Sequence, residues 1–283
     1  MEALLSLAFD NLSSNDGGKI RKGLRQVEGL VAQICLSKNK SSSIEKRRSA
    51  APPQTQPSSP KELASLKTDP AFREFFKLQQ GFEWNVPIRL ITCLDRLLGK
   101  GSTGQNDLLI LSTLDLIQGT LLLHPPSRAL FSREIYMNLL LDLLEPSNCP
   151  AIQCSTLLTL VCALLDQPRN TRSFETLDGL LTVTSLFKQR STSREVKLKL
   201  IEFLYFYLMP EIPGGSAAGL ARTPSKLLGA FSRNGNGAGE SGRSRKDTRT
   251  TEEKQALLGK YLSNVEDLVA DLRESAPFGG TVC

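Results

Sequence analysis

Histidine is almost absent from this chain, because His124 is its single histidine in 283 residues. Histidine is the side chain most often used as a general base near neutral pH, and it is a frequent zinc ligand. His124 stands before Pro125 at the expected end of a helix, where an imidazole commonly contacts the terminal carbonyls. We therefore predict a protein that is not an enzyme and that has no catalytic, cofactor-binding or metal-binding residues.

Other catalytic and membrane signals are also missing. The glycine-rich run at 99–104 lacks the GxxxxGK[ST] arrangement of a phosphate-binding loop, and it follows a helical pattern rather than a strand. The six cysteines show no CxxC spacing, which favours reduced thiols. No apolar run approaches the roughly 20 residues that cross a bilayer, and no signal peptide is apparent. We expect a cytoplasmic protein without a membrane partner.

Aromatic residues make up 6% of the chain, and leucine dominates the apolar set. This composition suits packing of helix on helix better than a sheet, so the predicted class is all-α. Residues 1–37 show two stretches of helical spacing separated by Asn15-Asp16-Gly17-Gly18, which predicts an N-terminal helical hairpin packed on the rest of the fold.

A repeat with a period of about 40 residues runs through 62–213. Leu111-Ser112-Thr113-Leu114 leads to Pro125, and Cys154-Ser155-Thr156-Leu157 leads to Pro168, 43 positions later; Pro210 ends a third helix after 42 more. Such a period indicates an armadillo/HEAT-like helical repeat, an α-α superhelix, although an irregular helical bundle is the alternative. The predicted helices are 86–98, 106–123, 134–144, 151–165, 179–188 and 193–209.

The formal charge of +6 is concentrated outside this core. Residues 38–61, which are basic and rich in serine and proline, carry +5; residues 214–250, rich in glycine, serine and arginine, also carry +5. Both segments are predicted to be disordered linkers, and 274–283 a disordered tail. Because the basic segments have hardly any aromatic residues among their cations, we expect no nucleic-acid partner.

Two segments have apolar surfaces suited to contact with another helix or another protein. The helix at 200–209 is apolar at nine of ten positions, so either Phe203, Tyr205, Phe206 and Tyr207 form a partner surface or this helix is the buried centre of the fold.

Residues 251–273 form an amphipathic pattern after a possible capping box at Thr250 and Glu253, and this C-terminal helix is predicted to dock on the last repeat or on a partner. Candidate phosphorylation sites are Ser49, Ser59 and Thr223, which lie beside basic residues or proline.

The block at 69–86, which reads DPAFREFFKLQQGFEWNV, resembles the fungal cell division control protein fourteen family, as do 111–114 and 202–208. The resemblance covers most of 1–213 and leaves out the C-terminal tail. It implies a non-catalytic scaffold or regulatory subunit that binds a germinal-centre-type (Ste20-like) protein kinase of the septation initiation network. It also implies location at the cytoskeleton-associated spindle pole body and a role in septum formation and cytokinesis.

Two alternatives to this function remain. One is a general armadillo-type adaptor in transport or trafficking, and the less favoured one is a nucleic-acid-binding helical repeat protein.

Overall fold

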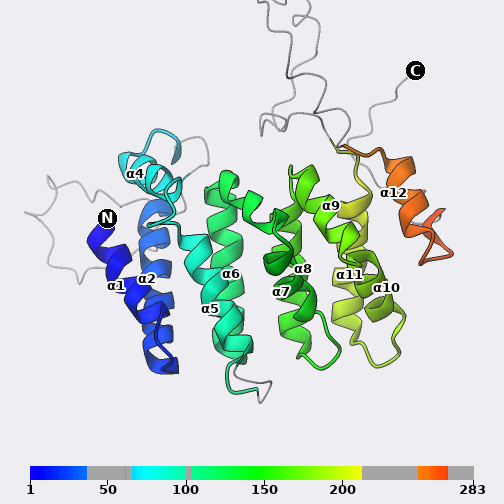
Figure 1. Cartoon of the computed structure of the whole chain (residues 1–283), viewed down its shortest axis with the longest axis horizontal. Helices are drawn as coiled ribbons and strands as arrows, with labels where there is room; N and C mark the ends of the chain where they lie inside the picture. Colours follow the sequence, from blue (N-terminus) through cyan, green and yellow to red (C-terminus); the bar gives the residue numbers. More distant parts are fainter. Residues whose placement is uncertain (37–60, 62–65, 100–103, 212–247, 267–283) are drawn as a thin grey trace, which may run out of the picture. The chain divides into compact units, whose positions relative to one another are not determined.

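The computed structural model describes residues 1–36, 61, 66–99, 104–211 and 248–266, and their regular elements are helices (Figure 1). These ranges contain no β-strand apart from a single bridge residue, Leu36. The predicted all-α class is therefore confirmed. Most of the predicted linkers and the tail at 274–283 lie outside the described residues. The chain divides into two compact units, Met1–Ser127 and Arg128–Cys283, so the predicted core at 62–213 contributes to both.

The first unit is built from five described helices. They are α1 (Glu2–Leu12), α2 (Gly17–Cys35), α4 (Pro70–Gln79), α5 (Val86–Leu98) and α6 (Asp107–Leu123). Helices α1 and α2 form the hairpin expected at the start of the chain, and α2 and α5 both pack against α6. The hairpin closes tightly at Gly23, where an added Cβ would lie 2.9 Å from the backbone nitrogen of Leu12.

Side-chain caps mark the starts of α2, α4 and α5. Asp69 precedes α4, and its Oδ1 accepts hydrogen bonds from the backbone N–H groups of Ala71 and Phe72 at 2.8 and 3.2 Å. Its Oδ2 accepts from the Lys61 ammonium at 2.7 Å, and this ammonium also donates to the carbonyl of Ile34. Lys61, which the sequence placed in a linker, is thus anchored to two helices.

A buried polar network lies between the end of α4 and the end of α6. The Asn85 side-chain amide donates to the carbonyl of Gln79 at 2.7 Å and to Ser127 Oγ at 3.0 Å, 42 positions along the chain. The His124 ring lies 2.8 Å from Ser127 Oγ through Nδ1 and edge-on to the Phe76 ring. The imidazole therefore contacts a hydroxyl rather than the helix carbonyls that its sequence position suggested. The chain turns after α6, where the Ser127 N–H donates to the His124 carbonyl, and this turn brings the Ser127 hydroxyl to the ring.

The second unit contains six described α-helices. They are α7 (Glu134–Asp142), α8 (Pro150–Leu164), α9 (Pro168–Thr176), α10 (Gly179–Lys188), α11 (Arg194–Leu208) and α12 (Thr251–Leu258), preceded by the 3-10 segment η1 (Pro125–Ser132) at the boundary between the units. Most α8 side chains are buried because α7, α9 and α11 pack around it. All six helix ranges predicted within the repeat region agree with the structure to within two residues at each end.

Hydrogen bonds in this unit again join positions about one predicted period apart. Asn170 is fully buried, and its amide donates to the carbonyls of Arg128 and Ala163 at 2.7 and 2.6 Å. Arg128 lies 42 positions before Asn170, and the hydroxyl of Ser173 donates to the carbonyl of Ser132, 41 positions earlier. Asparagine therefore links successive helical segments in both units.

The C-terminal helix is shorter than the predicted span 251–273. The capping box at Thr250 and Glu253 is present as expected, but α12 ends at Leu258. Gly259 follows as the C-cap, and the chain turns before helical conformation resumes at Val265. Glycine ends the helix because it has the lowest helix propensity after proline. Residues 267–273 lie outside the described residues.

Among the described helices, no single one is long and apolar enough to cross a membrane. Helix α6 meets that requirement only together with the segment after it, as a sharply bent pair.

Replacing Gly179 by alanine is expected to destabilise the second unit. An added Cβ would lie 2.4 Å from the Phe174 ring and 2.6 Å from its carbonyl oxygen, so the packed ring would have to move. We expect a loss of about 2 kcal/mol or more in the free energy of unfolding. Gly29→Ala is the matched control because no atom lies within 4 Å of its added Cβ; this change should stabilise α2 by about 0.5–1 kcal/mol. Urea denaturation measures both, and equal effects would contradict the packing argument.

Acid should destabilise the fold through His124. Burial lowers the pKa of His124 from 6.5 to about 4, whereas the unfolded chain takes up this proton near 6.5. The free energy of unfolding should therefore fall as the pH drops from 6.5 toward 4, by up to about 3 kcal/mol. His124→Asn should show a correspondingly smaller loss between pH 7 and pH 4.5 in urea denaturation. Identical pH dependence in both proteins would disprove this assignment.

Candidate partner-binding site

The aromatic helix α11 divides its side chains between the core and the surface. Phe203 and Tyr207 are each 1% exposed, and both rings lie against Phe174, with centroids 5.5 and 6.4 Å away. Tyr205 and Phe206 are half-buried. Four residues were proposed as a partner surface, with burial of this helix in the fold as the alternative. Phe203 and Tyr207 are buried in the core, as the alternative predicted.

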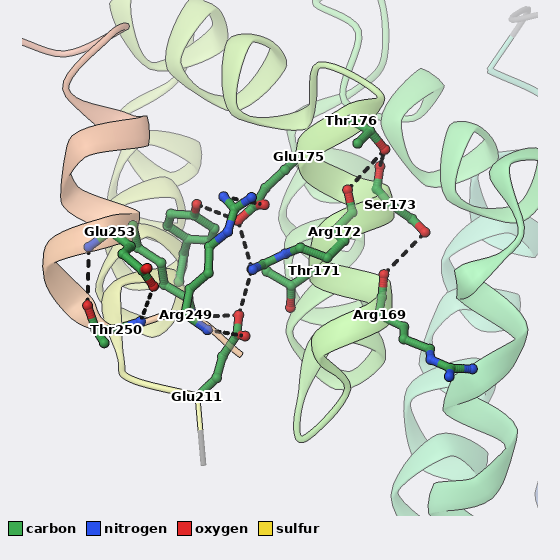
Figure 2. A network of polar contacts seen from close by, with 12 residues as sticks. Arg169, Thr171, Arg172, Ser173, Glu175, Thr176, Glu211, Arg249, Thr250 and Glu253 are labelled. Atoms are coloured by element: carbon green, nitrogen blue, oxygen red, sulfur yellow. Dashed lines mark hydrogen bonds and ion pairs between the residues drawn. The ribbon is translucent and has the colours of Figure 1, made fainter. Parts of the chain in front are cut away.

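A cluster of charged side chains covers the end of α11, and we call it the C-terminal clasp: Arg172, Glu175, Glu211, Arg249 and Lys254 (Figure 2). The Arg172 guanidinium, on α9, bridges two carboxylates. Its Nη2 lies 2.9 Å from Glu175 Oε1 and 2.8 Å from Glu211 Oε1. Both carboxylates are largely buried, so they require such partners to remain charged.

The chain returns to this cluster at Arg249, 38 positions after Glu211. The Arg249 backbone N–H donates to Glu211 Oε2 at 2.9 Å, and its carbonyl accepts from the Glu211 backbone N–H at 3.1 Å. The Arg249 guanidinium also lies 2.7 Å from Glu175 Oε2. These three contacts hold the segment before α12 against the end of α11.

Lys254 completes the clasp from α12. Its side chain is 5% exposed, and its ammonium lies 3.1 Å from Glu211 Oε1 and 2.9 Å from the carbonyl of Met209, just past the end of α11. It also lies over the Tyr207 ring, 5.2 Å from the centroid. A cation is favourable at a helix C-terminus because the unpaired carbonyls there carry partial negative charge.

Burial and charge act against each other on the titratable groups of the clasp. Burial lowers the pKa of Lys254, while Glu211 acts to raise it. Burial raises the pKa of Glu175, although the Tyr207 hydroxyl donates to it at 2.8 Å and favours the charged carboxylate. The pKa of Tyr207 is strongly raised by burial and by this same carboxylate. The clasp therefore suits a fixed ion network better than proton transfer.

A cleft of about 190 Å³ opens beside the clasp, between the ends of α8 and α11. Its apolar wall includes Leu164, Leu165, Pro168, Phe206, Met209 and Pro210. Asp166, Glu211 and Lys254 supply polar groups, so the clasp forms part of its lining. The half-buried Phe206, one of the proposed partner residues, thus faces a real concavity.

Helices α8 and α11 also share an outer surface, which we call the α8–α11 face: Leu158, Leu198, Glu195, Glu202, Tyr205 and Met209. Leu158 and Leu198 are 42% and 52% exposed, and Met209 is 50% exposed. The two helices pack against each other. Burial and, to a smaller extent, Glu195 on α11 raise the pKa of Cys154 on α8. Leu158 lies one turn beyond Cys154 on α8. Because Lys199 pairs with Glu202 at 2.7 Å, the face is apolar with a border that carries charges of both signs.

Within the described ranges, no three His, Cys, Asp or Glu side chains gather where they could hold a metal ion. The described cysteines are free thiols, as expected from their spacing. The predicted phosphorylation sites Ser49, Ser59 and Thr223 lie outside the described residues. The groups that the structure does bring together form apolar surface and paired charge, an arrangement suited to binding another chain.

Sequence reasoning missed the clasp. The pair Arg172 and Glu175 has the i,i+3 spacing of a helical ion pair, which is a weak local signal. Glu211 lies at the end of the predicted core at 62–213 and Arg249 near the end of the predicted linker at 214–250, and local sequence carries no information about their contact. The docking of α12 on α11, one of two predicted outcomes for that helix, is observed through Lys254. Lys188 at the end of α10 also donates to the carbonyl of Tyr261, just after α12.

The fold and this site define an all-helical protein with an exposed apolar face and a cleft, both of which lie beside a fixed ion network. Residues 1–278 match the family model described as cell division control protein 14, SIN component, and the chain belongs to that family of septation initiation network components. It is 32% identical over 288 residues to cell division control protein 14 of Schizosaccharomyces pombe, covering 99% of this chain and 97% of the relative. No solved structure matches the chain.

Neutralising Glu211 should open the C-terminal clasp. Glu211→Gln leaves three cations around one remaining carboxylate, so we expect the segment at 248–258 to lose about 2 kcal/mol of local stability, a roughly 30-fold rise in its opened fraction. Hydrogen exchange of the α12 amides measures this change. Glu202→Gln is the control, because its pair with Lys199 is exposed and contributes little. Unchanged exchange in Glu211→Gln would show that α12 is held by other contacts.

Proposed function

We propose that this protein is a non-catalytic scaffold or regulatory subunit that binds a germinal-centre-type (Ste20-like) protein kinase in the septation initiation network. Membership of the SIN component family carries the proposal, because it assigns the chain to a cell-division network. The role would be to promote septum formation and cytokinesis, with the protein cytoplasmic and associated with the spindle pole body.

An armadillo-like stack of helical repeats would supply the framework for this role. In such a stack each repeat packs on its neighbours, and the third helices line a continuous binding surface. Support comes from the hydrogen bonds that join positions 41 or 42 residues apart, at Asn85, Asn170 and Ser173. Helices α8 and α11 would be third helices of successive repeats.

The α8–α11 face is the docking surface that we assign to the kinase. Three large apolar side chains, Leu158, Leu198 and Met209, are 42–52% exposed on it, and the cleft beside Phe206 offers a pocket for an anchoring side chain. Exposed apolar groups that border a preformed concavity are typical of protein interfaces. Because Glu195 and the Glu202–Lys199 pair border this surface, the matching kinase segment should be apolar with polar residues at its edge, including a basic residue beside Glu195.

The clasp would serve this surface by holding one wall of the cleft in place. Lys254 and Glu211 both line the cleft, and both are fixed by buried ion pairs. A preformed pocket binds more tightly than one that must be ordered on binding, because less conformational entropy is lost. The clasp is thus a positioning device for the proposed interface.

Charge introduced on the α8–α11 face should abolish kinase binding. We expect Leu198→Glu combined with Met209→Glu to weaken the affinity for the purified Ste20-like kinase by about 100-fold, since each change desolvates a carboxylate against apolar surface. Isothermal titration calorimetry measures this affinity.

Leu181→Glu is the matched control, because Leu181 is 45% exposed on α10 and lies outside the face. The control should bind normally. Failure of the unaltered chain to bind any Ste20-like kinase would overturn the proposed function. Normal binding by the double variant would show that the kinase does not dock on the α8–α11 face.

A further inference from the structure

Helix α2 carries an unusual concentration of positive charge. Lys19, Arg21, Lys22 and Arg25 are all exposed, and Glu28 is the single carboxylate within the helix. None of the four cations forms an ion pair or a side-chain hydrogen bond with another described residue. By contrast, the neighbouring cations Lys61 and Arg96 are both engaged, Lys61 with Asp69 and Arg96 with the carbonyls of Leu12 and Ser13.

These cations stand where they do not stabilise their own helix. Lys19 lies in the first turn of α2, where the unpaired N–H groups carry partial positive charge and a cation is unfavourable, and Asp16 at the N-cap offsets this charge. Arg21, Lys22 and Arg25 lie in the second and third turns, beyond the range of this effect. Ion pairing within the helix does not account for their placement either, because they form no pair with Glu28.

The same face continues beyond the cations with small side chains. Gly29 follows Arg25 by one turn and Ala32 follows by two, on the side of α2 away from its buried residues. No atom lies within 4 Å of a Cβ added at Gly29, so packing does not require glycine there. Gly23 differs, because its missing side chain admits the backbone of α1. At Gly29 the absence of a side chain leaves the helix backbone open to an approaching chain.

We propose that the solvent face of α2, with Arg21, Lys22 and Arg25 beside Gly29 and Ala32, is a docking surface for an acidic segment of a partner protein. Charge complementarity determines the class of occupant. Arg21, Lys22 and Arg25, which pair with no described residue, outnumber the exposed Glu28 one turn further along the same side of the helix. They match carboxylates spaced along an extended or helical segment. The open backbone at Gly29 lets that segment approach closely. This surface lies in the first unit and is independent of the proposed kinase site.

The test uses the full chain and a fluorescein-labelled deca-glutamate peptide, with binding followed by fluorescence anisotropy at about 0.15 M salt, where charges more than about 8 Å apart are largely screened. Reversing two charges with Arg21→Glu and Arg25→Glu should weaken peptide binding by about 10-fold or more. Lys67→Glu with Lys77→Glu is the matched control, since both lysines are exposed in the same unit and the change in net charge is identical. This control should change the affinity less than about 2-fold.

Gly29→Leu separates close docking from diffuse attraction because it changes no charge. We expect it to weaken peptide binding by about 5-fold, with an unaltered circular dichroism spectrum, because the new side chain blocks the open face. Equal weakening by the lysine control, or no effect of Gly29→Leu, would overturn the proposal. Tighter binding of a single-stranded oligonucleotide than of the peptide, lost in the arginine variant, would also overturn it and assign the face to nucleic acid.

Discussion

Two helices of this protein, α8 and α11, are too apolar to be left uncovered, and the second unit is organised around this constraint. Burying them against each other leaves the far side of α11 still apolar, where Phe203 and Tyr207 project. Helix α9 covers part of that side through Phe174, and the returning C-terminal segment covers the end. The apolar end of α11 is thus covered by the C-terminal segment, and the ion pairs of the clasp hold that segment in place.

The clasp shows how buried charge can add specificity to an apolar contact. Burial alone would let α12 slide along α11, because apolar surface is non-directional. Glu211 accepts from a guanidinium, an ammonium and a backbone N–H; the first comes from α9 and the other two from the returning C-terminal segment. Each contact requires one register, so together they fix the position of the C-terminal segment and shape the neighbouring cleft.

Local sequence predicted the helices well. The six ranges in the repeat region follow from leucine periodicity and from prolines at helix ends, both of which act within a few residues. The capping box at Thr250 was also predicted correctly. The predicted end of the C-terminal helix was wrong, because Gly259 ends the helix at Leu258. A stripe of apolar residues shows that a segment can be helical, and a single glycine decides where it stops.

The candidate site was harder to predict, because its residues are distant in sequence. The aromatic run on α11 was correctly singled out, yet which of its rings are buried depends on neighbours such as Phe174. The net charge of each segment placed the excess positive charge in the linkers, and this hid the local cluster on α2, where Arg21, Lys22 and Arg25 share a solvent face. Net charge over a segment does not show which side chains find partners after folding.

The sequence by itself determined the helical class, the six helix ranges in the repeat region and the membership of a septation initiation family, because these depend on local periodicity and on residues that can be compared directly. The tertiary structure alone decided which aromatic rings are covered, which charges are paired and where the cleft opens. These properties depend on contacts between segments some 40 residues apart, such as Glu211 with Arg249 and Asn170 with Arg128. Such contacts form only when chain folding brings the segments together, and no local pattern encodes them.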